Sequence, residues 1–500
     1  MKQSVDRFSV FGCVVVVVLL AHSGRVFAAL QTQLDELVHA ANLGQTRYAI
    51  HVHDLTRDLR LASVSSDALM IPASNMKLLT TAGAIDALGG DFVYFTELRS
   101  VTTGGAPVLW VVGNGDPTFG SPDVLASHGI EVDELLGTWV DAARQTGITR
   151  WSALVVDDRV FDRQFTHPDW PADQLANRWC AGVAGLSFYG NCVEVIPQPS
   201  EIRGAAPSIR LFPPADFFET TNRATTGRSD SFWVSRDMER DRLVFRGSVR
   251  NKRRTGISVS VRDPAIYLGK HLRQALAEGG LEVSAVTRPT EGYRPKEFEA
   301  LHRVETSLSV VLEQANRDSN NLAAEGLIKT IGWRTTGQQG SWETGTAALR
   351  LRLRDRLGPS AATLQIADGS GLSRNNRVTA RLMVSLLETM WRDESSRELF
   401  VNSLAVGGET GTLDDRMSRG FEGVTVRAKS GYLNGVSALS GYVILDEGAA
   451  DESVVAFSLM FNDFKRPISN SQLKRLQDQI VAAIARDLAR KQEREALASP

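Results

Sequence analysis

The chain has 500 residues, 43% of them hydrophobic and 23% charged, which is the composition of a globular protein and excludes wholesale disorder. Its formal net charge of -2 gives no reason to expect a nucleic acid or a charged membrane surface as a partner. The length exceeds that of one ordinary hydrophobic core, so roughly two or three domains are expected.

The first 28 residues have the pattern of an export signal. Lys2 and Arg7 precede an apolar run at residues 8–21, and residues 26–28 (Val-Phe-Ala) offer a small-residue cleavage site. The run is short for a membrane-spanning helix, which needs about 20 apolar residues, although an uncleaved anchor is the alternative. No later segment is apolar enough to span a bilayer. We therefore expect a periplasmic or secreted chain with no integral membrane segment after cleavage.

The segments after the signal alternate between helix and strand. A helix is predicted at residues 34–41, where apolar side chains recur at helical spacing up to Gly44. Alternation at residues 48–53 predicts a strand, and a polar turn leads to its partner at residues 59–64. A long helix is predicted at residues 75–88, ended by a Gly-Gly pair.

The middle of the chain, from residue 92 to about residue 289, has a different character. It consists of short β-like runs separated by Gly, Pro and Asp. The clearest runs are residues 108–112, 153–156 and 243–249. This pattern predicts a β-rich region between the two ends of the chain.

The last part returns to longer elements. Helical periodicity appears at residues 265–277 and more strongly at residues 308–331. Three strands and a closing helix follow, at residues 425–428, 438–445, 454–461 and 476–488. Helices and strands at both ends, enclosing a β-rich middle, indicate one α/β domain with a large insertion.

The cysteines agree with export. Cys13 would leave with the signal, so that only Cys180 and Cys192 remain. An even pair, close in sequence in an exported chain, predicts a disulfide. Closing so short a loop would stabilise the fold by ~3 kcal/mol in the chain-entropy description. Two unpaired buried thiols are the alternative.

Ser74 and Lys77 are the candidate nucleophile and base. A serine needs a base to remove its proton, and a lysine one helical turn later shares its face of a helix. In the Ser-Asn-Met-Lys sequence at 74–77 the serine opens the predicted helix, where peptide N–H groups can stabilise an oxyanion. Burial near other cations would lower the pKa of the lysine and supply a neutral amine. The same spacing recurs at Ser471 and Lys474, which we interpret as solvated residues on the closing helix.

A second element, of the form Ser-x-Asn, is found at Ser319 and Asn321. Its serine can pass a proton between the lysine and a leaving group, and its amide can hold a peptide carbonyl. The element precedes a helical run, so capping of that helix by Ser319 is the structural alternative. A second copy, at Ser373 and Asn375, lies in a glycine-rich loop and is the weaker candidate.

The third element, Lys429-Ser430-Gly431, occurs once, at the end of a β run. A strand can pair with an extended peptide, its lysine can attract a terminal carboxylate, and a glycine permits close approach. Seen alone, this tripeptide would be a turn at a strand end. The ordered set on helix, helix and strand is typical of penicillin-binding proteins and serine β-lactamases.

In these motifs the chain resembles the D-alanyl-D-alanine carboxypeptidase/endopeptidase family of low-molecular-mass penicillin-binding proteins, in the serine β-lactamase/transpeptidase-like superfamily. The likeness extends over nearly the whole mature chain. It is carried by Arg416 and by the stretches at residues 72–78, 113–117, 319–325, 368–373, 411–413 and 429–431.

The resemblance implies a role for each motif residue. Ser74 would be the acylated nucleophile and Lys77 the general base. Ser319 would complete the proton contacts and Asn321 the amide contact with the substrate.

The third motif and its flank would bind the end of the substrate. By resemblance, Lys429 and Ser430 receive the carboxylate beside Gly431. The backbone N–H groups of Ser74 and Tyr432 form the oxyanion hole. The motif often reads Lys-Thr-Gly followed by a small hydroxyl residue. Ser430 replaces the threonine but keeps the hydroxyl, so the chemistry is expected to survive. Tyr432 lacks the small hydroxyl beside the substrate, so the substrate preference is left open.

The implied fold is α/β (α+β): a β-lactamase/transpeptidase-like domain with a central antiparallel sheet flanked by helices, plus one or two inserted β-rich domains. Lys77 and Ser319 are roughly 240 residues apart, which leaves room for the insertion. We expect the signal at 1–28, the catalytic domain at 30–92 and 301–492, one inserted domain at 93–160 and 250–300, and a second at 161–249.

The implied function is that of a serine-type D-Ala-D-Ala carboxypeptidase or endopeptidase. It would act on peptidoglycan stem peptides, be acylated and inhibited by β-lactam antibiotics, and need no cofactor. Two alternatives stay open: a serine β-lactamase that deacylates quickly, and a cell-wall binding protein without activity.

Other signals carry less weight. His51 and His53 share one face of a predicted strand, but the sequence offers no further ligand cluster, so no metal is expected. The glycines at residues 113–120 lack the Gly-Lys-Ser/Thr of a phosphate loop. All eight histidines precede Arg303, so a Ser–His–Asp triad gains no local support.

Overall fold

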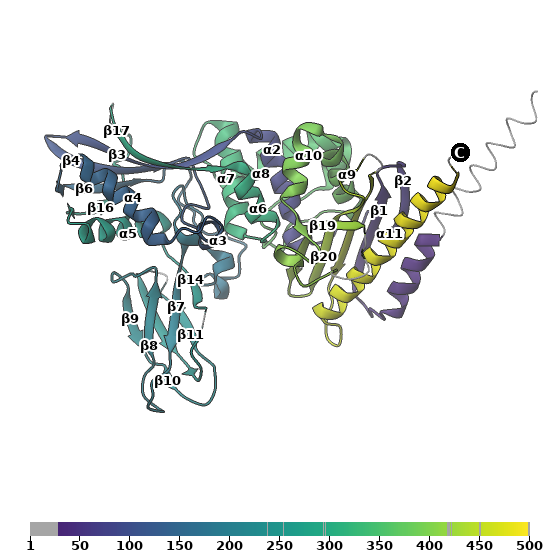
Figure 1. Cartoon of the computed structure of the whole chain (residues 1–500), viewed down its shortest axis with the longest axis horizontal. Coiled ribbons are helices and arrows are strands. Elements are labelled where there is room, and N and C mark those ends of the chain that lie inside the picture. Colours follow the sequence, from purple (N-terminus) through teal and green to yellow (C-terminus); the bar gives the residue numbers. More distant parts are fainter. Residues whose placement is uncertain are drawn as a thin grey trace, which may run out of the picture.

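A computed structural model of the chain describes residues 29–498 apart from 238, 254, 294, 296, 418–420, 422, 450 and 451. The predicted signal, with Cys13, lies outside these residues. Among the helices that are described, none combines the length and the apolar character needed to cross a membrane. The molecule is elongated, with a six-stranded sheet and its helices at one end and β-rich lobes at the other (Figure 1).

The six-stranded sheet joins the two ends of the chain, and every neighbouring pair of strands is antiparallel. The first strand pairs with the last over its full length, from Arg47 opposite Asn462 to Asp54 opposite Val455. The predicted central antiparallel sheet is therefore confirmed. In spatial order its strands are β18 (Ala405–Val406), β19 (Val424–Leu433), β20 (Val436–Leu445), β21 (Ser453–Asn462), β1 (Arg47–Asp54) and β2 (Leu59–Val64).

Helices cover both faces of this sheet because β20 and β21 are buried at every position and present apolar side chains to both sides. One face packs against the closing helix and against the helix at residues 29–40. The other face packs against the helices that carry the site. These elements are α11 (Asn470–Ala498) on the first side and α2 (Met76–Leu88), α6 (Leu308–Asn316), α7 (Asn321–Thr336), α8 (Trp342–Leu357), α9 (Ala380–Arg392) and α10 (Glu394–Asn402) on the second.

The helical periodicity predicted at residues 308–331 is interrupted in the structure. α6 ends at Asn316 and α7 begins at Asn321. Asn320 caps α7 by accepting a hydrogen bond from the backbone of Ala323, and Ser319 has a positive φ of 58°. A cap and a left-handed residue stop the first helix, so that Ser319 lies in a turn.

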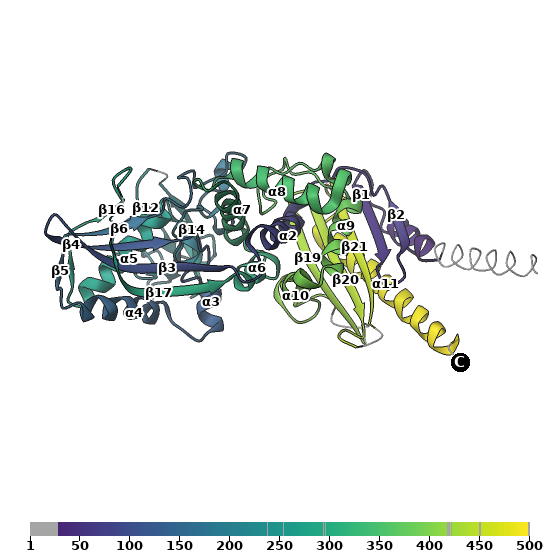
Figure 2. The ribbon, with the colours of Figure 1, turned by 90° about the horizontal axis from the view of Figure 1, so that it is seen from above.

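The first inserted lobe is built on a five-stranded sheet, and its hydrophobic core continues into the second inserted lobe. β17 lies beside β3, so the chain leaves the helical region and returns to it along neighbouring strands. Figure 2 shows α2, α6 and α7 between this lobe and the six-stranded sheet. The spatial order is β16 (Val286–Thr287), β6 (Ala153–Asp157), β4 (Ala106–Gly113), β3 (Val93–Thr103) and β17 (Glu299–Ser307), with β5 (Arg150–Trp151) and β15 (Glu282–Val283) paired nearby and with α3 (Pro122–Ser127), α4 (Val132–Gln145) and α5 (Pro264–Glu278).

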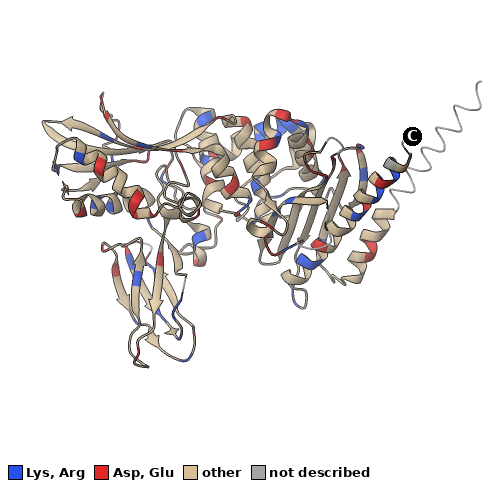
Figure 3. Cartoon of the chain, viewed as in Figure 1, with Lys and Arg blue, Asp and Glu red and all other residues tan. Residues whose placement is uncertain are grey.

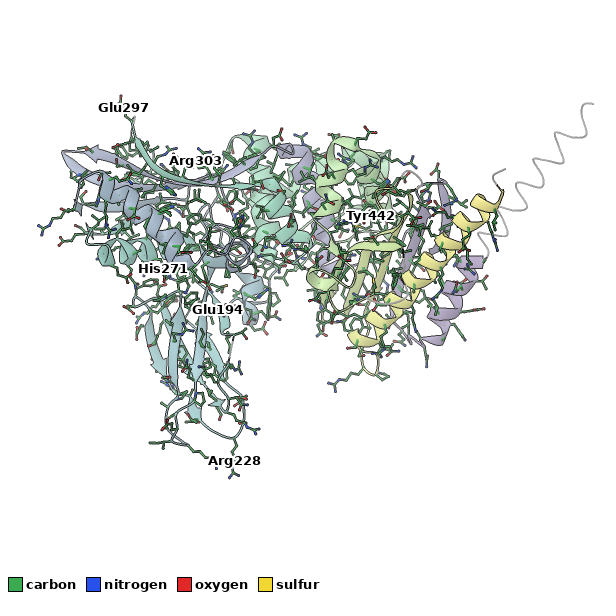
Figure 4. The ribbon with its side chains drawn as sticks, viewed as in Figure 1. Glu194, Arg228, His271, Glu297, Arg303 and Tyr442 are labelled. Carbon is green, nitrogen blue, oxygen red and sulfur yellow. The ribbon has the colours of Figure 1, made fainter. Side chains whose placement is uncertain are left out.

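A second lobe of small sheets projects from the first (Figure 1), and Figure 4 shows Arg228 at its far tip and Glu194 near its base. The predicted run at residues 243–249 is two strands because Gly247 has a φ of 88° and leaves no room for a Cβ against Ser231. Acidic and basic residues are mixed over both lobes and the helical region (Figure 3). The strands are β14 (Ile257–Ser260), β7 (Cys192–Gln198) and β8 (Ser208–Phe212); β11 (Trp233–Arg236), β12 (Arg242–Arg246) and β9 (Glu219–Asn222); and β10 (Thr225–Thr226) with β13 (Ser248–Val249).

The predicted disulfide between Cys180 and Cys192 is wrong in this structure, where both thiols are free and buried. Cys180 belongs to the hydrophobic core formed by α2 and α6–α10, whereas Cys192 begins β7, where its carbonyl accepts a hydrogen bond from Tyr267. Burial raises the pKa of each thiol to about 12. Such thiols are packed as small apolar side chains and are poor partners for oxidation.

Candidate active site

Ser74 lies in the short 3₁₀ turn η1 (Ala73–Asn75), immediately before α2. Ala73 has a positive φ of 48°, which is uncommon for a residue with a side chain. Gly371 presses on this turn: its φ is 85°, and a Cβ there would lie 1.8 Å from the carbonyl oxygen of Ala73. Only a glycine fits at position 371. Its close contact with Ala73 holds the backbone of the turn that carries Ser74.

Lys77 is fully buried one turn after the serine. Its Nζ donates to Ser74 Oγ at 3.2 Å, to Asn321 Oδ1 at 2.7 Å and to the carbonyl of Ser370 at 3.0 Å. The structure thus brings together two of the predicted motifs, the Ser-x-x-Lys and the Asn of Ser-x-Asn. Its third contact, to Ser370, was not expected as part of the site.

Burial lowers the pKa of Lys77 to about 8, although the nearby carboxylates of Glu325 and Asp368 oppose this shift. A pKa of about 8 leaves roughly a tenth of the amine unprotonated at pH 7, far more than for a free lysine. Burial also lowers the pKa of Lys429 well below its usual value, and the charge of Lys77 lowers it further. The charge of Lys77 thus disfavours protonation of Lys429, and a carboxylate entering the site would favour the charged form of Lys429 again.

The third motif lies within β19 and not beyond its end. A Cβ on Gly431 would be 3.1 Å from the backbone nitrogen of Ser74, so the strand passes directly beside the serine. β18 pairs only with Arg427 and Ala428, which leaves the outer edge of β19 unpaired among the described strands from Lys429 onward. An extended peptide can add to such an edge.

Thr412 connects this strand to the Ser-x-Asn turn. Ser430 Oγ donates to Thr412 Oγ1 at 2.8 Å, and the Thr412 backbone donates to the Arg317 carbonyl at 3.1 Å. Lys429 Nζ donates to the carbonyl of Ser430 at 2.9 Å. Tyr432 follows with 55% of its side chain exposed, at the rim of the site.

Ser319 lies in the turn between α6 and α7, and its hydroxyl makes no hydrogen bond with Ser74 or Lys77 in the described part of the chain. It lines an open groove with a volume of about 1080 Å³. The groove continues away from the helices along the inserted lobes. It is bounded by Ser121, Pro122, Asp123, Asn177, Arg178, Trp179, Tyr189, Gly190, Cys192, Glu194, Ile196, Phe212, Thr255, Gly256, Ile257, Ser258 and Asp318–Leu322.

The Asn321 amide has both of its groups occupied. Its oxygen accepts from Lys77, and its nitrogen donates to the carbonyl of Trp179 at 2.8 Å. Trp179 belongs to the insertion, which therefore reaches the position where a substrate carbonyl was expected. Sequence reasoning missed Trp179 because its partner lies 142 residues away.

The duplicate motifs have other roles. Ser373 and Asn375 both bond to the carboxylate of Asp169, at 2.6 and 2.9 Å. Ser471 and Lys474 lie in the first turns of α11, where Ser471 is exposed. Neither copy contributes a side chain to the contacts of Ser74.

The two histidines considered as ligands have separate surroundings. Burial lowers the pKa of His51 to about 4. His53 lies with Asp58 and Glu388, with potential ligand atoms within 4.8 Å of one another. Arg392 forms ion pairs with Asp58 at 3.6 Å and with Glu388 at 3.0 Å. Its guanidinium therefore already neutralises the negative charge that would attract a metal cation.

Comparisons with known proteins agree with this geometry. The family described as D-Ala-D-Ala carboxypeptidase 3 (S13) matches residues 30–487. A D-alanyl-D-alanine carboxypeptidase of Actinomadura sp. (strain R39) is 30% identical over 472 residues, covering 89% of this chain and 83% of the relative. The D-alanyl-D-alanine carboxypeptidase DacB of Haemophilus influenzae is 24% identical over 429 residues, covering 83% and 85%. The crystal structure of penicillin binding protein 4 from Haemophilus influenzae has the same fold, with a TM-score of 0.74 at 21% identity over 90% of this chain and 99% of that chain.

Proposed function

The chain belongs to the D-Ala-D-Ala carboxypeptidase 3 (S13) family of serine peptidases, and from this premise we propose that it cleaves peptidoglycan stem peptides through an acyl-enzyme on Ser74. The observation that carries the proposal is the 3.2 Å contact between the Lys77 amine and the Ser74 hydroxyl. It is supported by the lowered pKa of the lysine, which makes the amine a base near neutral pH.

In the first step the neutral amine of Lys77 takes the proton of Ser74 while Oγ attacks the carbonyl carbon of the penultimate D-alanine. The backbone N–H groups of Ser74 and Tyr432 stabilise the oxyanion. The C–N bond then breaks, and the departing amine takes the proton from Lys77. A relay through the Ser319 hydroxyl would require that side chain to move into contact with the Lys77 amine, which it does not touch in the described part of this structure. Terminal D-alanine leaves, or a cross-linking amine leaves in the endopeptidase version.

In the second step water attacks the ester carbonyl. Lys77 removes a proton from this water, and the Ser74 oxygen leaves and regains a proton. The products are the free acid and the original enzyme. The neighbouring Lys429, Ser430 and Gly431 favour binding of the substrate as an added strand, with its carboxylate at the buried amine. Asn321 would exchange its contact with Trp179 for the peptide carbonyl.

The test is incubation with a labelled penicillin, followed by mapping of the adduct by mass spectrometry. A β-lactam presents a carbonyl to the same nucleophile, so a single long-lived adduct on Ser74 is expected. An adduct on another serine, or none, would refute the assignment. Rapid release with turnover of the antibiotic would favour the β-lactamase alternative, and binding to peptidoglycan without acylation would favour the non-catalytic one.

The rate constant for this acylation is expected to rise with pH. Only the neutral form of Lys77 accepts the proton, so below its pKa of about 8 each pH unit should raise the rate about tenfold. Above that pH the rate should level off. Stopped-flow acylation by a fluorescent penicillin measures this profile, and a rate that does not change between pH 6 and pH 8 would contradict the role of Lys77 as base.

The proposal extends to export and domain organisation. We propose cleavage of the signal at residues 1–28 and location in the periplasm or outside the cell, in keeping with the apolar run at residues 8–21. The inserted lobes share a hydrophobic core that is separate from the core of the helical region, which supports a catalytic domain at 30–92 and 301–492 with the insertion between.

A further inference from the structure

We propose that the inserted segment at residues 162–170 is a positioning element of the acylation step, because it fastens the loop whose Ser370 carbonyl holds the Lys77 amine. This inference rests on the proposed function. It assigns a role to a part of the insertion that lies between the first and second motifs and makes no contact with Ser74 itself. Residues 368–376 form this loop, the lysine loop.

The lysine loop contacts the Lys77 amine and the backbone of Ala73, which precedes Ser74. The carbonyl of Ser370 accepts from Lys77 Nζ at 3.0 Å, and that of Gly369 accepts from Thr80 Oγ1, one turn further along α2, at 2.7 Å. Gly371 meets the carbonyl of Ala73 in the turn that presents Ser74. A shift of this loop would therefore move the base and the backbone of the nucleophile together.

The fully buried carboxylate of Asp368 holds the loop in shape, and the insertion holds Asp368. Its oxygens accept from the backbones of Gly371 at 2.9 Å and Ser373 at 2.6 Å, and from the amide of Asn376 at 2.8 Å. The fourth donor is the indole N–H of Trp170, at 3.2 Å. Because a buried charge needs all of its donors, removing this indole N–H would leave the loop less well fixed.

Asp169 provides a second attachment to the same loop. Its Oδ2 accepts from Ser373 Oγ at 2.6 Å and from Asn375 Nδ2 at 2.9 Å. These hydrogen bonds, led by that from Ser373, lower the pKa of the Asp169 carboxyl. The Ser-x-Asn copy at Ser373 and Asn375, which does not contact Ser74, is thus the place where the insertion is hydrogen-bonded to the loop.

The segment also supports the other side of the loop, through Trp342 and Glu325. Glu325 is fully buried and accepts from the backbones of Gly369 at 3.0 Å and Ser370 at 2.8 Å, and from Trp342 Nε1 at 2.8 Å. The Trp342 ring packs edge-on against Trp170, with ring centroids 5.7 Å apart.

Lys329 completes this support from α7. Its buried amine donates to Asp162 at 2.6 Å and to the carbonyl of Gln164 at 2.8 Å, and lies 4.0 Å from the centre of the Trp342 ring. Both ends of the inserted segment are therefore tied to residues that hold the lysine loop.

The two carboxylates also set the charge on the base. Both raise the pKa of Lys77 against the effect of burial. Burial raises the pKa of Glu325 to about 7, with a further contribution from Asp368. Trp170 fixes the position of the Asp368 side chain, so the insertion influences the pKa of Lys77 as well as its position.

The test compares Trp170→Phe with a matched control, Trp151→Phe. Both tryptophans are buried in the insertion, but the indole N–H of Trp151 has no hydrogen-bond partner in the described structure. A misplacement of about 1 Å in a reacting group can cost roughly a hundredfold in rate, so Trp170→Phe should lower kcat by about tenfold or more. KM should stay within about twofold of wild type, and the control should keep both values.

Two further measurements keep the outcomes distinct. Hydrogen exchange of the peptide covering residues 368–376 should become faster in Trp170→Phe and stay unchanged in Trp151→Phe, whether or not the enzyme turns over. Asp368→Asn should move the rise of the acylation profile to lower pH, because a charge that raises the pKa of Lys77 is removed. Asp169→Ala, at a partly exposed position, repeats the kinetic test if Trp170→Phe does not fold.

The proposal is overturned if the lysine loop loosens but kcat matches that of the control, or if neither the exchange nor kcat changes. Failure of the wild-type protein to form an adduct on Ser74 would instead overturn the proposed function, and the exchange experiment would still report whether the insertion holds the loop.

Discussion

Ser74→Ala is expected to abolish release of D-alanine and formation of the penicillin adduct. In the proposed mechanism the Ser74 oxygen becomes acylated, and no other nucleophile contacts Lys77 Nζ among its described hydrogen bonds. Loss of a serine nucleophile that acts together with its base typically costs on the order of 10⁴–10⁶ in kcat. A discontinuous assay of free D-alanine from a pentapeptide, with the labelled penicillin in parallel, measures both effects.

The sequence offers a matched control for this variant. Ser471→Ala removes the serine of the second Ser-x-x-Lys copy, which is exposed at the start of α11, and should leave activity and adduct unchanged. The Ser74→Ala protein should keep the melting temperature of the wild type within a few degrees because the turn backbone is held by Gly371 and not by the hydroxyl. Persistent D-alanine release in this variant would assign catalysis to another site.

Lys77→Met is expected to lower the acylation rate by about 10²–10⁴, the range for loss of a general base. Methionine fills much of the same buried volume. It cannot accept the proton of Ser74, and it cannot donate hydrogen bonds to Asn321 or Ser370. The residual rate should lose the rise with pH that the lysine confers. The measurement is stopped-flow acylation across the same pH range, with Lys474→Met, the lysine of the second copy, as the control.

Stability distinguishes loss of the base from loss of the fold. A lysine pKa that falls from 10.5 to about 8 on folding corresponds to about 3 kcal/mol that opposes folding of the charged form. Because the folded pKa is the lower one, this cost is fully present below pH 8 and disappears as the pH rises through the unfolded value. Lys77→Met removes the cost, so its melting temperature at pH 7 is expected to equal or exceed that of wild type. A large decrease would indicate that the hydrogen bonds of Lys77 outweigh its burial.

The hydrogen bond between Asn321 and Trp179 must break before Asn321 can bind a substrate carbonyl. The amide expected to hold the peptide carbonyl already donates to a carbonyl of the insertion at 2.8 Å. Substrate binding therefore exchanges one hydrogen bond for another of the same kind, with little net gain. Affinity must come from other contacts, such as the unpaired edge of β19 and the groove beside Ser319.

The sequence by itself determined that Ser74, Lys77 and Asn321 would meet, and which helices would hold them. The one-turn spacing of Ser74 and Lys77 places both on one face of a helix wherever that helix lies, and period-two alternation predicted the strands. The expected positions agreed closely for β2, which is residues 59–64 in both, and for β4 and β6. These features depend on interactions between near neighbours, which the order of residues records directly.

Only the tertiary structure decided what surrounds the base. Glu325, Asp368 and Ser370 lie within motif stretches, but their burial and their contacts with Lys77 result from packing of α2, α7 and the lysine loop. The two cysteines were assigned to a disulfide on compartment and spacing, whereas the fold places them as separate buried thiols. Partners distant in the chain, such as Trp170 and Asp368, leave no periodic signal, because their approach depends on how whole elements pack and not on local propensity. The lowered pKa of Lys77 is also a property that the sequence does not record, because burial causes it and the side chain is buried only once the chain has folded.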